Sequence, residues 1–125
     1  MFMTINEITK EILDSAYKVH SALGPGLLES AYRACLAYEL NKKGLLVEEE
    51  KPVPLIYEEV KLNCGYRMDL LVENLVVVEL KTVDTFNDVH IAQVLTHLRF
   101  GNKKVGLLIN FNVKSLREGI KRLIL

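Results

Sequence analysis

Residues 69–81 read Asp-Leu-Leu-Val-Glu-Asn-Leu-Val-Val-Val-Glu-Leu-Lys, which is two apolar runs on either side of a Glu-Asn pair. Each run is apolar at consecutive positions, a pattern typical of strands that are covered on both faces. Charged residues interrupt the pattern at Asp69, where the first strand starts, and at Glu79 and Lys81, where the second ends. The stretch therefore predicts a buried pair of strands with charged side chains at one end.

The length of the turn decides whether the two acids face each other. Glu79 and Lys81 are two residues apart and share a face of their strand. A two-residue turn would pair Asp69 with Val78, whereas a three-residue turn over residues 73–75 would pair Asp69 with Glu79. Two carboxylates about 5 Å apart would repel by roughly 3 kcal/mol at an effective dielectric near 20. Either an internal salt bridge to Lys81 or a bound divalent cation would relieve that repulsion.

The rest of the chain alternates between helical and extended patterns, with capping boxes and glycines at the boundaries. Helices are expected at about 4–23, 28–43 and 87–100 and from 115 to the C-terminus, and extended runs at 53–57, 60–62, 66–72, 76–81 and 104–110. The expectation is one α/β domain spanning residues 1–125, with the order α-α-β-β-β-α-β-α.

Two of the expected helices carry polar residues near their apolar faces. Glu29 lies on the apolar stripe of the second helix, almost in line with two leucines. Burying an unpaired carboxylate is costly, so Glu29 is paired or functional, or it lies in the first turn, where the helix dipole favours an acid. On the third helix, Gln93 lies between His90 and His97 and could orient a water or a phosphate oxygen.

Charge and hydropathy restrict the possible partners. The formal net charge is zero, from 16 basic and 16 acidic residues, which argues against a protein that coats nucleic acid indiscriminately. Basic residues are concentrated after residue 97, where they could serve a polyanion locally, although solvated lysines on helix surfaces are the commoner explanation. Arg99, Lys103 and Lys104 would be the residues that contact the phosphates of such a polyanion. The first residues lack a secretory pattern and no apolar run is long enough to cross a bilayer, so we expect a cytoplasmic protein without a membrane partner.

The spacing of Asp69 and the Glu79-Leu80-Lys81 triplet, inside a β-β-β-α-β run, resembles the PD-(D/E)XK nuclease superfamily. The stretch Gly-Leu-Leu-Glu-Ser-Ala-Tyr at 26–32 is similar to the signature of the GxxExxY family, a branch of that superfamily. Residues 88–93 and 104–112 resemble the same family. The chain departs from the pattern at two positions. Met68 precedes Asp69 where the superfamily's name has a proline, and His97 stands where relatives more often carry Tyr, so it is assigned no role.

The resemblance implies a restriction-endonuclease-like core, with a mixed β-sheet flanked by helices. It implies that Asp69, Glu79 and Glu29 hold Mg²⁺ or Mn²⁺, ions that prefer carboxylate oxygens. In this interpretation Lys81 positions or activates the attacking water, and Gln93 completes the catalytic pocket. Three further residues are expected to support the site: Gly26, Tyr32 and His90.

The expected function is therefore a Mg²⁺-dependent phosphodiesterase, a nuclease that attacks DNA or RNA with a metal-activated water, DNA being favoured. A homodimer is expected, because so small a domain has little surface with which to grip a duplex. The alternative is a non-catalytic binding or accessory module that keeps the nuclease fold. Intact Asp69, Glu79 and Lys81 favour the enzyme, whereas the zero net charge favours the module.

Overall fold

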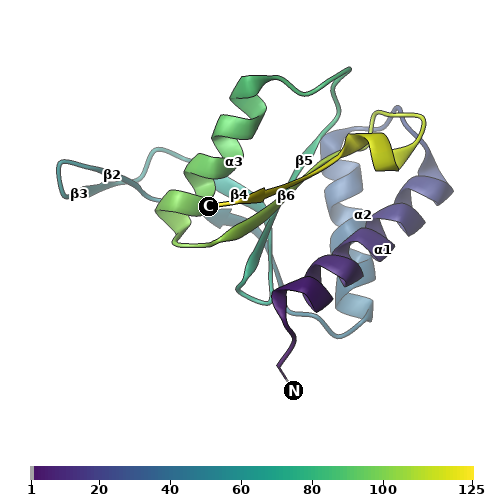
Figure 1. The fold of residues 1–125 in the computed structure, drawn as a ribbon, viewed down its shortest axis with the longest axis horizontal. Coiled ribbons are helices and arrows are strands. Elements are labelled where there is room, and N and C mark those ends of the chain that lie inside the picture. Colours follow the sequence, from purple (N-terminus) through teal and green to yellow (C-terminus); the bar gives the residue numbers. More distant parts are fainter. Residues whose placement is uncertain (1) are drawn as a thin grey trace.

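A five-stranded mixed sheet separates two helical layers in the computed structural model, which describes residues 2–125 (Figure 1). The sheet contains β1 (Val47–Pro52), β4 (Arg67–Val72), β5 (Val76–Lys81), β6 (Val105–Asn110) and β7 (Ile120–Ile124), in the spatial order β1-β4-β5-β6-β7. The other elements are α1 (Ile5–Leu23), α2 (Glu29–Lys42), α3 (Asp88–Gly101), the hairpin strands β2 (Leu55–Tyr57) and β3 (Val60–Leu62), and the 3₁₀ turn η1 (Leu116–Gly119). β5 and β6 pair in parallel and α3 connects them, whereas the other neighbours are antiparallel.

Both faces of the central strands are buried, as their continuous apolar runs predict. Leu70 and Val78 pack on the face covered by α1 and α2, whereas Leu71 and Val77 pack on the face covered by α3 (Figure 1). The predicted mixed sheet flanked by helices is therefore confirmed. Within residues 2–125, no helix combines the length and the apolar character needed to cross a membrane.

The first and third predicted helices begin where their capping signals place them. Thr4 and Glu7 form the predicted capping box at the start of α1. Asn87 caps α3, and its side-chain oxygen accepts a hydrogen bond from the backbone N–H of His90 at 3.0 Å. These caps satisfy backbone N–H groups that have no partner within a helix.

The turn between β4 and β5 has the three-residue length that brings the acids opposite each other. Leu70 pairs with Val78 and Val72 with Val76, so the same register continued outward places Asp69 opposite Glu79. A tight turn does form after Val72, with positive φ at the two following residues, and Leu75 is then the extra residue before β5. That added residue shifts the register and moves Glu79 onto the face of Asp69.

The predicted C-terminal helix is wrong. Ser115 makes no side-chain cap, η1 is a single short turn, and the chain continues as β7 along β6. Gly119 allows this path, because a Cβ there would lie 2.3 Å from the backbone oxygen of Asn110. Pairing with the free edge of β6 outweighs the local helical signal, since a sheet edge presents unpaired N–H and C=O groups.

β1 was not predicted from the sequence. Its residues, Val-Glu-Glu-Glu-Lys-Pro, lack apolar alternation because it is an edge strand that is largely open to solvent. The hairpin predicted around Glu58 and Glu59 is confirmed as β2 and β3, but these strands form a separate ribbon that projects from the body (Figure 1). The predicted element order therefore fails at the C-terminus and between α2 and α3, where it has three strands and the structure has five.

Candidate active site

Asp69 and Glu79 lie on the face of the sheet that α3 covers, at the end of β4 and β5 remote from their turn. The Oδ2 atom of Asp69 accepts a hydrogen bond of 2.7 Å from the backbone N–H of Leu80. Glu79 is buried, with 5% of its surface exposed, and Asp69 is half-buried. The strands thus hold two carboxylates side by side in a poorly solvated position.

A cleft of about 420 Å³ opens beside these acids. β4, β5 and α3 form its walls, and the preceding Tyr66 contributes as well. The lining residues are Tyr66, Arg67, Asp69, Glu79, Lys81, Val89, Ala92, Gln93, Thr96 and His97. The cleft therefore combines carboxylates, cations and an amide in one space.

Burial makes ionisation of both acids less favourable than it is in water. It is the largest influence on Asp69 and raises the pKa of that carboxyl, although the Leu80 hydrogen bond and the charge of Lys81 oppose the shift. Burial also raises the pKa of Glu79, and the neighbouring charge of Asp69 raises it further, against the hydrogen bond from His97. A bound cation would offset this unfavourable concentration of negative charge.

Lys81 does not neutralise the acids through a direct salt bridge. It lines the same cleft, but among residues 2–125 it makes no ion pair. Glu79 instead contacts His97, whose Nδ1 lies 2.8 Å from Oε1. The internal Glu79–Lys81 pair that the sequence left open is therefore not formed, and the Lys81 ammonium keeps its hydrogen-bond donors for a ligand.

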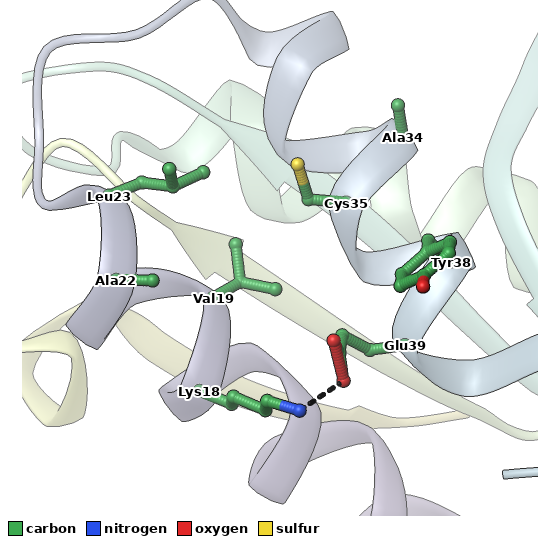
Figure 2. Close-up of a pocket in the computed structure, with 8 residues that line it drawn as sticks. All are labelled: Lys18, Val19, Ala22, Leu23, Ala34, Cys35, Tyr38 and Glu39. Atoms are coloured by element: carbon green, nitrogen blue, oxygen red, sulfur yellow. Dashed lines mark ion pairs between the residues drawn. The ribbon is translucent and has the colours of Figure 1, made fainter. Parts of the chain in front are cut away.

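A second hollow, between α1 and α2, has a different character (Figure 2). Its volume is about 310 Å³ and its walls are mainly apolar, with Val19, Leu23 and Cys35 facing the space (Figure 2). Its two charged residues, Lys18 and Glu39, pair with each other at 3.0 Å. This groove offers no unpaired charged group for chemistry, so we place the candidate active site in the cleft.

Comparison with known families agrees with this geometry. A family model described as the PD-(D/E)XK nuclease superfamily matches residues 6–123. The chain belongs to this superfamily. No match was found among curated proteins or among solved structures. The mixed sheet with helices on both faces is consistent with the restriction-endonuclease-like fold implied by the sequence resemblance.

The PD-(D/E)XK residues predicted from the sequence are only partly assembled. Asp69, Glu79, Lys81 and Gln93 all line the cleft. Glu29, the first residue of α2, is half-buried and does not line it. Burial raises the pKa of Glu29 and the charge of Asp69 raises it further, so the two carboxylates lie within electrostatic range without sharing the cleft.

The donor set fits a divalent ion held by two carboxylates rather than three. Within residues 2–125, no three His, Cys, Asp or Glu side chains are close enough to form a metal-binding group, so the predicted trio with Glu29 is not formed. Oδ2 of Asp69 and Oε1 of Glu79 already accept hydrogen bonds, whereas Oδ1 and Oε2 have no hydrogen-bond partner within residues 2–125 and would be the favoured ligands. Magnesium is commonly bound by one or two carboxylates and keeps several waters. The residues present therefore fit the metal that the superfamily implies.

The predicted supporting residues stabilise the elements that carry the site. The hydroxyl of Tyr32 donates to the backbone oxygen of Gly24 and accepts from the N–H of Leu27, at 2.5 and 3.2 Å. Gly26 lies inside the loop held in this way, at a φ of 104° that side chains rarely tolerate. His90 does not line the cleft, because its Nδ1 accepts from the N–H of Asn87 at 3.1 Å and completes the cap of α3.

The predicted phosphate-binding residues lie outside the cleft. Arg99 stacks on the ring of Phe100. Lys103 donates to Asn74 at 3.0 Å, and Lys103 and Lys104 border a separate hollow near the β4–β5 turn. This turn is at the end of the strands opposite to the acids, so a backbone bound in the cleft would meet these cations only if it extended across α3.

Arg67 and His97 are among the cleft residues that were assigned no role in the sequence analysis. Arg67 is two residues before Asp69 and therefore shares its face of β4. Strand alternation in the sequence could have predicted this placement. His97 is one helical turn beyond Gln93, so the two share a face of α3. The pairing of His97 with Glu79 has no local signal, because it depends on how α3 crosses the sheet.

Proposed function

We propose that the chain is a divalent-metal-dependent phosphodiesterase that hydrolyses nucleic acid, with DNA favoured over RNA. The observation that carries this proposal is the opposition of Asp69 and Glu79 across β4 and β5, in a cleft shared with Lys81, which makes no ion pair within residues 2–125. The charges of a buried and a half-buried carboxylate that repel each other oppose folding, and a bound cation would relieve that repulsion, which supports a cation site here.

Asp69 and Glu79 would hold Mg²⁺ or Mn²⁺ through their free oxygens. When bound, the ion supplies a Lewis acid that lowers the pKa of water and neutralises charge that develops on the phosphoryl oxygens. Lys81 would donate hydrogen bonds to the attacking water and hold it in line with the phosphorus atom. The water oxygen would form the new P–O bond and release its proton to solvent, while the bond to the leaving oxygen would break and that oxygen would take a proton from solvent.

The remaining cleft residues would position the substrate. Arg67 is an exposed cation on the cleft wall, and a guanidinium can donate two parallel hydrogen bonds to a phosphate. Gln93 is exposed on α3 and can donate to a phosphoryl oxygen or orient the water. Both contacts would be to the sugar–phosphate backbone, so recognition would tolerate different sequences.

The family branch, the cellular location and the oligomeric state of the chain are also part of the proposal. The 26–32 motif supports membership of the GxxExxY branch. A cytoplasmic homodimer is also proposed. The chain exposes 7499 Å² in total, and a specific DNA interface buries about 1,000–2,500 Å² of protein, so a second copy would supply gripping surface.

The second candidate function is a nucleic-acid-binding or accessory module without turnover. The observation that favours it is the absence of a three-carboxylate group within residues 2–125. The zero net charge also limits general attraction to a polyanion. In this case the cleft would bind a phosphate backbone and leave it intact.

A cleavage assay separates the two functions. Labelled duplex, branched and single-stranded oligonucleotides would be incubated with Mg²⁺ or Mn²⁺ and with wild type, Asp69→Asn or Lys81→Met. If the chain is an enzyme, wild type should cleave, and the cleavage rate of both variants should be at least about a hundredfold lower, because each lacks a group that stabilises the transition state. Binding in Ca²⁺ without cleavage in Mg²⁺ or Mn²⁺, even at high protein concentration, would select the module.

A further inference from the structure

His97 connects α3 to the candidate metal ligands through one short contact. Its Nδ1 lies 2.8 Å from Oε1 of Glu79, and the two side chains are 12% and 7% exposed. When Glu79 is ionised its carboxylate can only accept hydrogen bonds, so in that state the Nδ1–H of His97 donates a hydrogen bond to Oε1. A buried, charge-assisted bond of this length restricts how the Glu79 carboxylate can rotate.

The hydrogen bond also makes the two carboxylate oxygens of Glu79 inequivalent. Oε1 is engaged by His97, whereas Oε2 has no hydrogen-bond partner among residues 2–125. The opposing Asp69 is restrained in the same way, since Oδ2 accepts from Leu80 and Oδ1 has no hydrogen-bond partner in the part of the chain that the structure describes. Each acid would therefore offer one oxygen without a hydrogen-bond partner to a divalent ion.

One oxygen per carboxylate suits some ions better than others. Mg²⁺ requires near-octahedral geometry with short bonds of about 2.0–2.1 Å and is satisfied by monodentate carboxylates and water. Ca²⁺ takes about six to eight oxygens at longer distances and readily binds both oxygens of one carboxylate. The hydrogen bond from His97 takes one of the two lone pairs of Oε1 and fixes the orientation of the carboxylate, which disfavours bidentate binding at Glu79.

We propose that His97 is a positioning residue that keeps Glu79 monodentate and so selects Mg²⁺ and Mn²⁺ against Ca²⁺. This inference rests on the proposed function, because it assumes that Asp69 and Glu79 hold a divalent ion. It assigns a role to a residue that touches neither the substrate nor the ion. Its effect acts through Glu79 alone.

Metal titrations of the whole chain without nucleic acid test this role directly. Dissociation constants for Mn²⁺ and Ca²⁺ would be measured by isothermal titration calorimetry for wild type, His97→Ala and His97→Asn. His97→Ala should weaken Mn²⁺ binding about tenfold, in the range seen when an outer-shell partner of a ligand is lost. Ca²⁺ binding should be unchanged or tighter, so the preference for Mn²⁺ over Ca²⁺ falls by about tenfold or more.

His97→Asn should restore most of the preference, because the Asn amide nitrogen occupies nearly the place of Nδ1. His20→Ala is the matched control: His20 is also buried, and its Nε2 contacts the Val113 oxygen at 2.8 Å, away from the cleft. That variant should lose stability without any change in the ratio of the two constants. A purely structural histidine would make His97→Ala and His20→Ala behave alike.

Each outcome bears on one proposal or on both. Asp69-dependent Mn²⁺ binding with an unchanged Mn²⁺/Ca²⁺ ratio in His97→Ala would overturn the role of His97 and leave the nuclease proposal standing. If wild type binds neither ion, both proposals fail. If His97→Ala does not fold, His97→Asn is compared with His97→Gln, whose amide nitrogen lies one bond further out. Equal ratios in those two variants would overturn the positioning role.

Discussion

The Oδ2 atom of Asp69 accepts a hydrogen bond of 2.7 Å from the backbone N–H of Leu80. If the β4–β5 ladder continued, that N–H would face Met68, so the carboxylate takes the place of a backbone partner. One side chain therefore closes the end of the strand pair and presents its second oxygen to the cleft. Asp69 thus has a structural role at the end of the strand pair and a candidate role as a metal ligand. Different substitutions at this position can separate the two roles.

Asp69→Asn and Asp69→Ala should differ in stability but not in metal binding. Asn keeps an oxygen that can accept from Leu80, so unfolding by denaturant should change little. Ala leaves a part-buried N–H without a partner, which should cost about 1–3 kcal/mol. Both variants lack the carboxylate and should lose Mn²⁺-induced stabilisation. Equal stability of the two variants would show that the Leu80 contact contributes nothing.

Glu79→Gln should leave the metal-free protein as stable as wild type or more stable. Burial raises the pKa of Glu79, so the folded state holds the proton more tightly than the unfolded chain. The stability due to that proton is present at low pH and is lost as pH rises through the folded pKa. At neutral pH the charge therefore opposes folding, and Gln removes it.

Denaturant titrations with and without Mg²⁺ measure this effect. The variant should show no gain in unfolding free energy when Mg²⁺ is added, whereas wild type should gain. If Glu79 and His97 instead form a strongly stabilising buried ion pair, the substitution should cost roughly 3 kcal/mol or more. Such a loss would contradict the interpretation of Glu79 as a ligand held at the expense of stability.

Arg67→Gln should weaken nucleic-acid binding more than Lys103→Gln combined with Lys104→Gln. Arg67 lines the cleft, whereas the two lysines border a separate hollow. Loss of one phosphate contact should lower the slope of log affinity against log salt by about one, equally for all sequences. Fluorescence anisotropy in Ca²⁺ at several salt concentrations provides the slope. A larger effect of the lysine pair would instead indicate that the nucleic-acid backbone binds across α3.

Tyr32→Phe should destabilise the fold by about 1–2 kcal/mol, since it removes the hydroxyl that bonds to Gly24 and Leu27. The ring would still stack on Phe111 at 4.5 Å, so packing is retained. Tyr38→Phe is the matched control on the same helix, because Tyr38 is 63% exposed. Thermal unfolding of the two variants gives the comparison. Equal behaviour would mean that the loop before α2 does not depend on the Tyr32 hydroxyl.

Local signals were enough to predict much of this molecule. The caps at Thr4 and Asn87 fall where the sequence places them, and the apolar runs of β4 and β5 are buried on both faces. These features depend on residues within one helical turn or one strand of each other. The clustering of Asp69, Glu79 and Lys81 followed from strand alternation once the turn length was known.

Long-range contacts decided the remainder. Whether Leu75 belonged to the turn or to β5 could not be read locally, yet it set which face Glu79 occupies. The C-terminal segment carries a helical signal at Ser115 but forms β7, because the open edge of β6 offers backbone partners that only the folded sheet creates. His97 meets Glu79 across 18 residues of chain for the same reason. A hydrogen bond between distant residues forms only after the packing of α3 on the sheet has brought its donor and acceptor together.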